Sequence, residues 1–389
     1  MKRLCSILCI LLLCFSVFGC GGTKDKSNEI VKDTIQKQEQ KQENKVPAVS
    51  SQAAQAAAAL VQKKQDAVNK KDIEEFMNTV NTNDREYYAE ERHWFQDIQV
   101  NDISGYKLEI VDITKEEEGS YLVDLNQTYT FGGKKKSLKY KAVFKDSEGG
   151  MTDFGLDFKE KETDHFIIKY MEKSEKLAGD FSRAAEEAYA IVKSNYGKVP
   201  EDKTVIKIYD DMETLRQFVK LSFQWDMAGW YEYSEAIKFI GWSSEVRAES
   251  LAHELIHKVT IKDTNNNMPY WLAEGLATHY TEKPIKSGSL KKPMSIEKLE
   301  SIDLEALTDN TEISSYYKSA QNAVELIIGK YGEKALRDIL QELSKHPFQD
   351  HTGSEVNGKN IQLFDEASKK VLGKSTVELD NGLEISETK

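Results

Sequence analysis

The feature that most constrains the fold is a short segment, LAHELIHKV, in which two histidines stand four residues apart. On a helix, His253 and His257 lie about 40° apart on one face and one turn apart along the axis. Two imidazoles placed in this way can reach the same metal ion. The helix is therefore expected to stand where a third ligand can approach it.

Glu254 follows the first histidine and points about 100° away from it on the same helix. It can approach a water molecule on the metal without taking a coordination place. Two ligands and one base in this arrangement are what an H-E-x-x-H site requires. The alternative is a core or surface helix with two unrelated histidines, which these five residues alone do not exclude.

The next segment, PYWLAEGLATHY, follows the polar loop KDTNNN and contains the candidate third ligand. Pro269 suits the first turn of a new helix, which places Glu274 about a turn and a half inside it. If this helix returns antiparallel, Glu274 meets the histidines, and two histidines with one carboxylate are a standard set for catalytic zinc, Zn2+. Gly275 is expected to allow close packing against the histidine helix. A solvated Glu274 is the competing interpretation, and its apolar neighbours weigh against it.

Together, LAHELIHKV and PYWLAEGLATHY resemble the gluzincin metallopeptidases, in particular the peptidase MA-like families of bacterial exported proteins. The order of elements from about residue 162 to 375 is similar too. The resemblance implies a zincin-like fold in which His253, His257 and Glu274 hold zinc. It implies that Glu254 is the general base.

The same families imply a tyrosine that donates a hydrogen bond to the oxygen on which negative charge develops. The segment YYKSA places Tyr316 at that position, with Tyr317 as the second choice and simple packing as the competing interpretation. Thr278 stands where some relatives have an acidic residue that orients a ligand, and His279 is expected to face elsewhere. The Gly-x-Met-Glu-Asn signature of related aminopeptidases is absent, which favours an endopeptidase.

The N-terminal segment carries a targeting signal, with two basic residues, an apolar run and small residues before a cysteine. Its end, VFGC, resembles a bacterial lipobox, which implies a signal peptide at 1–19 and lipid attachment at Cys20. An uncleaved membrane anchor is the alternative, but the apolar run is short for a span. The protein is expected on the extracytoplasmic face of a bacterial cell membrane, held by a lipid.

The positions of the cysteines and the net charge limit which covalent links, metal ligands and partners are expected. All cysteines lie in the N-terminal segment, so neither a disulfide nor a cysteine ligand is expected in the folded part. The formal net charge of −12 argues against nucleic acid as a partner. Residues 20–51, rich in lysine, glutamine and glutamate, are expected to form a disordered tether with a reach of roughly 30 Å.

Residues 52–161 are predicted to form an α+β domain, with helical segments first and strands afterwards. The segment SYLVDLNQTYTF alternates between apolar and polar residues, GGKKK turns the chain, and SLKYKAVF alternates again. This order resembles the NTF2-like fold, a curved sheet wrapped over helices, which hosts many functions and assigns none. The basic cluster is interpreted as a solvated hairpin tip, with membrane-surface contact as the alternative.

The second domain, residues 162–375, is predicted to begin with alternating strands and helices and to continue mostly as helices. HFIIKY, TVIKIY and AIKFIGW are the expected strands, and the last is expected to be an edge strand that binds an extended peptide. Ser243 or Ser244 is expected to cap the histidine helix. Residues 376–389 are expected to form a C-terminal tail.

These patterns predict an α+β protein in which a tether carries a zinc endopeptidase that hydrolyses peptide or protein substrates. The alternative is a non-catalytic lipoprotein that binds a ligand or a protein and keeps a zincin-like scaffold. A structural zinc site is disfavoured by Glu254 and by the missing fourth protein ligand. The substrate, the oligomeric state and the role of the N-terminal domain stay open.

Overall fold

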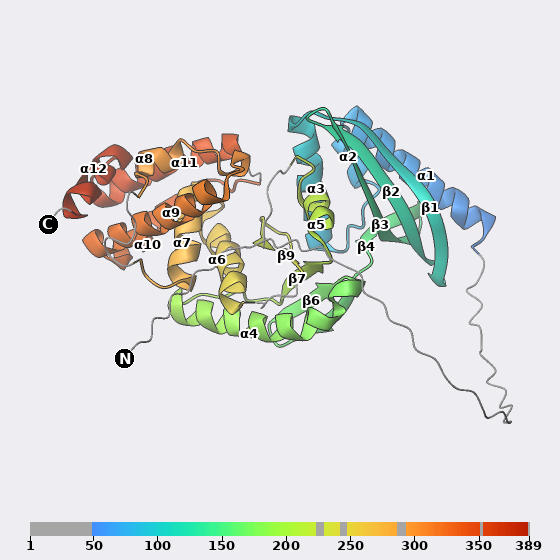
Figure 1. Cartoon of the computed structure of the whole chain (residues 1–389), viewed down its shortest axis with the longest axis horizontal. Helices are drawn as coiled ribbons and strands as arrows, with labels where there is room; N and C mark the ends of the chain where they lie inside the picture. Colours follow the sequence, from blue (N-terminus) through green and yellow to red (C-terminus); the bar gives the residue numbers. More distant parts are fainter. Residues whose placement is uncertain (1–48, 223–228, 242–246, 286–292, 351–352, 388–389) are drawn as a thin grey trace, which may run out of the picture. The chain divides into compact units, whose positions relative to one another are not determined.

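The computed structural model describes residues 49–222, 229–241, 247–285, 293–350 and 353–387, and these form an α+β fold with two sheets (Figure 1). The predicted fold class is thus confirmed. The expected signal peptide, Cys20 and nearly all of the expected tether lie outside the described residues. Within the described part, no helix combines the length and the apolar character needed to cross a membrane.

From residue 49 to 156 the chain forms helices first and an antiparallel sheet afterwards, as the sequence predicts. The helices are α1 (Ser51–Lys70), α2 (Ile73–Met77) and α3 (Arg85–Val100). The strands, which pair in chain order, are β1 (Ile103–Glu117), β2 (Ser120–Phe131), β3 (Lys134–Ser147) and β4 (Gly150–Leu156). The likeness to the NTF2-like fold stays a prediction.

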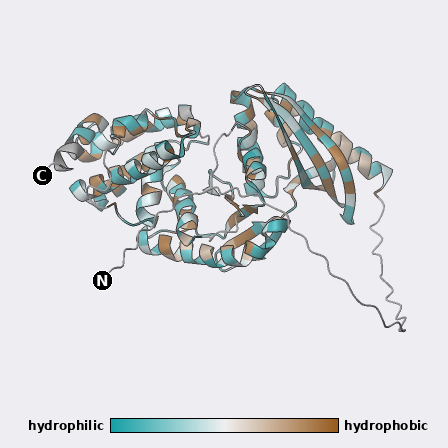
Figure 2. Ribbon diagram, viewed as in Figure 1, coloured by the Kyte–Doolittle hydropathy of each residue, from teal (hydrophilic) through white to brown (hydrophobic). Residues whose placement is uncertain are grey.

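Alternation along the strands decides which face of this sheet is buried. Tyr121, Val123 and Leu125 of β2 are buried, while the residues between them are partly exposed. Figure 2 shows hydrophobic and hydrophilic residues following one another along the strands of this sheet. In the register of the sheet, Tyr121 lies opposite Phe144 and Leu125 opposite Tyr140 of β3. Apolar residues on both strands therefore share one face, which packs against the helices.

The second sheet combines parallel and antiparallel pairing. Its strands are β5 (Lys159–Glu162), β6 (Phe166–Tyr170), β7 (Thr204–Tyr209), β8 (Gly229–Trp230) and β9 (Ile237–Ile240), in the order β5-β6-β7-β9-β8. The pairs β6–β7 and β7–β9 are parallel, and the outer strands β5 and β8 are antiparallel to their neighbours. The expectation that AIKFIGW is an edge strand is therefore wrong, because β9 lies between β7 and β8.

Both faces of this sheet are covered, which explains why every residue of β7 is buried. Ile206 and Ile208 belong to the main core with helix α4 (Ala178–Asn195), which follows the 3-10 helix η1 (Glu172–Leu177). Lys207 and Tyr209 alternate with them and so point to the opposite face. That face is covered by residues of α3 and of α5 (Met212–Val219).

The C-terminal part of the chain is helical. Its elements are α6 (Ala248–Thr264), α7 (Tyr270–Thr281), α8 (Ile296–Glu300), η2 (Leu304–Ala306), α9 (Asn310–Tyr331), α10 (Glu333–Leu343), α11 (Ser354–Leu372) and α12 (Thr376–Glu387). The segment expected to be a tail is instead the helix α12. Its Leu379 is fully buried, and Asp380 accepts hydrogen bonds from the first backbone amides of α8.

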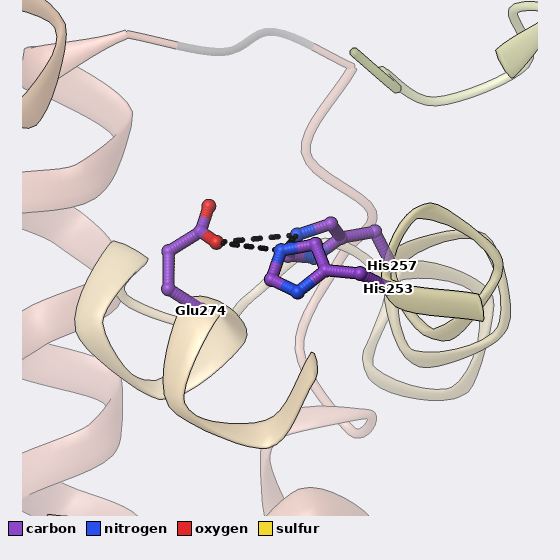
Figure 3. Close-up of side chains that lie close together, drawn as sticks. All are labelled: His253, His257 and Glu274. Atoms are coloured by element: carbon purple, nitrogen blue, oxygen red, sulfur yellow. Dashed lines mark hydrogen bonds and ion pairs between the residues drawn. The ribbon is translucent and has the colours of Figure 1, made fainter. Parts of the chain in front are cut away.

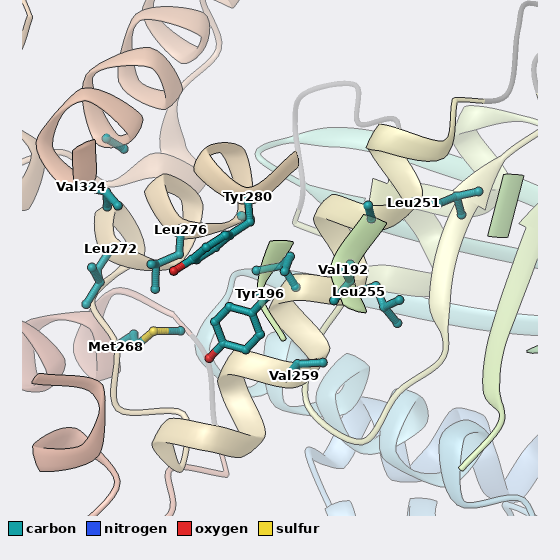
Figure 4. Close-up of a cluster of buried hydrophobic side chains, with 14 of the residues drawn as sticks. Val192, Tyr196, Leu251, Leu255, Val259, Met268, Leu272, Leu276, Tyr280 and Val324 are labelled. Atoms are coloured by element: carbon teal, nitrogen blue, oxygen red, sulfur yellow. The ribbon is translucent and has the colours of Figure 1, made fainter. Parts of the chain in front are cut away.

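Apolar side chains from three helices meet around the predicted metal-binding segments. Figure 4 shows Val192 of α4, Leu255 of α6 and Leu276 of α7 in this cluster. At most 1% of the surface of each of these three residues is exposed. Burial on this scale fixes the rotation of α6 and α7 about their axes, and so determines where their polar side chains point.

Candidate metal centre

Helix α6 carries the two histidines, and its first residue is Ala248, with Arg247 at the N-cap position. Ser243 and Ser244, the predicted caps, lie outside the described residues. Apolar packing holds this helix in place, because Leu251, Ala252 and Leu255 are almost fully buried.

The polar loop between α6 and α7 turns the chain back, as predicted. Asn265 and Asn266 adopt positive φ angles of 55° and 58°, which asparagine tolerates better than most residues. The side-chain amide of Asn267 is fully buried and donates to backbone carbonyls after α10, including that of Pro347. The amide of Asn360 on α11 donates to the loop carbonyls in turn. These bonds fix the point at which α7 begins.

The returning helix brings Glu274 to the histidines (Figure 3). Its Oε2 atom lies 3.1 Å from Nε2 of His253 and 3.4 Å from Nε2 of His257. The two Nε2 atoms are themselves 3.1 Å apart. The side chains that the sequence singled out as a ligand set therefore converge on one point between α6 and α7.

The spacing of these three atoms fits a tetrahedral zinc ion. Ligand atoms about 2.0–2.1 Å from zinc at tetrahedral angles lie about 3.3 Å from one another. The distances between the three donor atoms run from 3.1 to 3.4 Å. Two imidazole nitrogens and one carboxylate oxygen also leave a fourth place open, as a catalytic site requires.

Glu274 is stabilised as a carboxylate by its neighbours. Burial alone raises the pKa of such a group, but the charges and hydrogen bonds of His257 and His253 hold the pKa of Glu274 well below its usual range. A carboxylate that stays ionised and faces two imidazoles offers a divalent cation a charged ligand without a competing proton.

Glu254 lies beside the three converging side chains and is partly buried. Burial raises the pKa of Glu254 to about 7; His253 acts in the opposite direction, and the negative charge of Glu274 adds to the increase. A β-carbon at Gly229 of β8 would lie only 2.9 Å from Oε1 of Glu254 and 2.8 Å from the ring of Phe239. The edge strand β8 therefore runs directly against the carboxylate, and a larger residue at position 229 would displace a neighbouring side chain.

Gly275 has a different packing partner from the one predicted. A β-carbon there would lie 2.5 Å from the carbonyl oxygen of Ala320 and 2.8 Å from the side chain of Val324. Both residues belong to α9, so the close approach is between α7 and α9. The prediction of close packing against α6 is wrong, because Gly275 stands one residue further round the helix than the Glu274 that faces the histidines.

The two candidate tyrosines on α9 have different surroundings. Tyr316 is 1% exposed and belongs to the hydrophobic core. Tyr317 is partly exposed, its ring centre lies 6.1 Å from that of His253, and its hydroxyl lies close to Glu274. Burial and the charges of Glu274 and Glu254 raise the pKa of Tyr317, so its hydroxyl stays protonated and able to donate. The second choice, Tyr317, is thus the tyrosine that faces the candidate ligands.

Thr278 and His279 lie close to the ligand set in sequence but do not join it. The buried hydroxyl of Thr278 has no hydrogen-bond partner among the described residues, so it does not orient a ligand in this structure. Nδ1 of His279 lies 3.5 Å from Glu325 of α9, which agrees with the expectation that it faces elsewhere.

A second group of potential ligands, His93, Glu232 and Glu235, was not found from the sequence. Nδ1 of His93 lies 2.7 Å from Glu235 and 3.4 Å from Glu232. Lys238 pairs with Glu235, and Nζ of Lys220 lies 3.2 Å from Glu232. An ammonium group lies beside each of the two carboxylates, so these residues fit a buried ion-pair network better than a dication site.

A sequence signal for this network did exist. Lys207 and Lys238 interrupt the apolar strands TVIKIY and AIKFIGW, and both side chains are almost fully buried. Buried lysines require acidic partners. Glu90 supplies one, since its carboxylate pairs with both lysines.

Comparison with known proteins adds no assignment. No protein-family model matches the chain. No curated protein matches it either. Function therefore has to be argued from the residues and their geometry.

Proposed function

We propose that the protein is a zinc-dependent metallopeptidase that hydrolyses peptide bonds as an endopeptidase. One observation carries the proposal: the donor atoms of His253, His257 and Glu274 converge at tetrahedral spacing. Glu254, placed next to them without joining them, supplies the base that a purely structural site does not need. The gluzincin-like sequence pattern agrees with this geometry.

Each residue has a defined part in the proposed reaction. Zinc held by His253, His257 and Glu274 would supply a Lewis acid for the scissile carbonyl and would lower the pKa of a bound water toward about 7. The Glu254 carboxylate accepts a proton from the attacking water and passes it to the leaving amine. The Tyr317 hydroxyl donates a hydrogen bond to the carbonyl oxygen as negative charge develops on it. Tyr317 thus takes the role that the sequence had first suggested for Tyr316.

The substrate strand is proposed to lie along β8 rather than along β9. β8 is the outermost strand at one edge of the second sheet, and its Gly229 lies next to Glu254. An extended peptide added at this edge makes main-chain hydrogen bonds that carry little sequence preference. Such binding suits an endopeptidase that acts on unfolded segments.

Attachment to the extracytoplasmic face of the membrane through Cys20 is part of the proposal and rests on the sequence alone. Cys20 and the expected signal peptide lie outside the described residues. Labelling with a palmitate analogue tests it, since a Cys20→Ala variant should lose both the label and membrane association.

The alternative, a binding protein on an inactive scaffold, has less support. The cavity lined by Lys64, Glu91 and Asp153, on the side of the first sheet that faces the helices, has a volume of about 20 Å³. That is room for about one water molecule. A cavity of that size suits an ordered water molecule rather than an organic ligand, so it does not itself support the binding alternative.

The decisive experiment combines metal analysis with one substitution. The purified chain should contain one equivalent of zinc and cleave unfolded casein. Glu254→Gln should keep the zinc and lose roughly 10²–10⁴-fold in kcat. Metal without activity in either form would favour a binding or structural protein, and a chain that takes up no metal would end the proposal.

A further inference from the structure

Helix α3 presents four residues to the second part of the chain from a single face. Glu90, His93, Trp94 and Asp97 follow one another at intervals of three, one and three residues, which is helical face spacing. Each of the four contacts a residue between 207 and 238. This face is a separate feature from the candidate metal centre.

The C-terminal end of the face holds residues 217–222, which come before β8 in the chain and are separated from it by residues 223–228, outside the described part. Nε1 of Trp94 donates to the carbonyl of Gln217 at 2.9 Å. Asp97 accepts hydrogen bonds from both the backbone amide and the hydroxyl of Ser222. Leu221, between them, is 1% exposed and belongs to the core of the first sheet and its helices. Residues 217–222 are therefore embedded in the N-terminal part of the chain.

Side chains of the first sheet also contact this segment. Nε2 of Gln127 donates to the side-chain oxygen of Gln217 at 2.9 Å. The rings of Tyr140 and Phe218 pack edge to face with centres 4.9 Å apart. Gln217 and Phe218 thus line and fill the space beside the small cavity described above. Residues of α5 therefore contact the first sheet directly.

The N-terminal end of the face holds the segment that follows β8. Nδ1 of His93 lies 2.7 Å from Glu235. Glu90 accepts a hydrogen bond from the backbone amide of Ala236 at 3.2 Å and pairs with Lys207 and Lys238. These groups are almost entirely buried, so breaking one pair leaves an uncompensated charge.

We propose that this face of α3 fixes β8 beside Glu254 by holding residues 217–222 on one side and residues 232–236 on the other. β8 itself has only two residues, and among the described strands it pairs with β9, so its position depends strongly on the segments next to it. His93 and Asp97 are positioning residues for substrate binding, a role that rests on the peptidase function proposed above. The N-terminal α+β part then acts as a scaffold for the substrate-binding edge at β8.

The test compares His93→Gln and Asp97→Ala in the zinc-loaded full chain with two controls. Arg92→Gln changes an exposed neighbour on α3. Asn101→Ala removes the bond from Asn101 to Asp97 but leaves Ser222 in place. Hydrogen exchange of the backbone amides and steady-state kinetics on unfolded casein are measured for each. Ser222→Ala, which removes one hydroxyl, replaces Asp97→Ala if that variant does not fold.

We expect exchange at residues 229–236 to rise about tenfold in the two test variants, while α6 stays protected. KM should rise about tenfold with a smaller change in kcat and an unchanged zinc content. The controls should behave like the original chain. Loss of one metal equivalent in His93→Gln would instead assign His93, Glu232 and Glu235 to a cation and overturn the inference.

Two further outcomes separate this inference from the proposed function. Unchanged exchange at 229–236 in folded test variants would show that α3 does not fix β8, whether or not the chain is a peptidase. Raised exchange with unchanged KM in an active enzyme overturns the role in substrate binding. A chain without peptidase activity in any form refutes the proposed function and the substrate role, and exchange still decides whether α3 fixes β8.

Discussion

At the scale of single residues, the candidate site depends on where a few side-chain atoms point. Glu274 and Gly275 are adjacent in sequence, yet one faces the histidines of α6 and the other the backbone of α9. Tyr316 and Tyr317 divide in the same way, since one is in the core and the other faces the ligands. Neighbours on a helix point about 100° apart, so a shift of one residue decides between chemistry and packing.

Replacing the site tyrosine tests this division. Tyr317→Phe should lower kcat by roughly 10²-fold, because it removes a hydrogen-bond donor to the developing oxyanion. Tyr316→Phe should change kcat little. Both variants should keep their zinc, which metal analysis checks. A large loss in Tyr316→Phe alone would restore the first choice made from sequence.

Gly229 gives a second residue-scale prediction. In Gly229→Ala the new methyl group would lie 2.9 Å from Oε1 of Glu254 and 2.8 Å from the Phe239 ring. The carboxylate is the flexible neighbour and should move, which should lower kcat by about tenfold or more. Zinc binding should persist. Gly329→Ala is the control, since nothing lies within 4 Å of its added carbon. Equal activity in both variants would contradict the contact.

At the scale of elements, α7 is held between two helices with different tasks. On one side, Glu274 meets the histidines of α6. On the other, Gly275 lets the backbone approach that of α9 near Ala320. The loop of three asparagines fixes the start of α7 through bonds to carbonyls after α10. The position of Glu274 is therefore set by the packing of the opposite face of α7 against α9, where there are no candidate ligands.

Gly275→Ala tests the contact between α7 and α9. The added carbon would lie 2.5 Å from a backbone oxygen, which cannot move away like a side chain. Overpacking of this kind should lower the free energy of unfolding by about 1–3 kcal/mol. Urea denaturation measures it. Gly358→Ala on α11 has open space around it and should be neutral or slightly stabilising.

At the scale of the whole molecule, the ion pairs fall into a buried group and an exposed group, which differ in their effect on the structure. Ion pairs such as Lys207 with Glu90 lie where α3 meets the second sheet and are nearly inaccessible to solvent. Exposed pairs such as Lys334 with Asp338 contribute little to stability. The buried pairs join the two halves of the described chain, and neither sheet is independent of the other.

Metal removal gives a prediction at this scale. A ligand that binds only the folded state at 100 to 1,000 times its Kd stabilises by roughly 2.7–4.1 kcal/mol. A chelator should therefore lower Tm by about 5–15 °C, and added zinc should restore it. His257→Ala, which lacks one ligand, should melt at the lower temperature and ignore the chelator. A chelator-insensitive Tm in the unmodified chain would speak against a bound cation.

The sequence by itself determined the features that depend on local periodicity. The four-residue spacing of His253 and His257 requires one helical face, and KDTNNN followed by Pro269 requires a turn and a new helix. Alternation in β2 and β3 likewise determined which side chains share a face. Because these patterns act over one or two turns of the chain, they hold whatever lies next to them.

Only the tertiary structure decided which elements are neighbours. It placed β9 inside the sheet, Gly275 against α9, Tyr317 at the ligands and α3 against β7 and β9. Each of these contacts joins residues far apart in the sequence. Their partners are selected by the packing of the whole core and the pairing of buried charges, which no local pattern encodes.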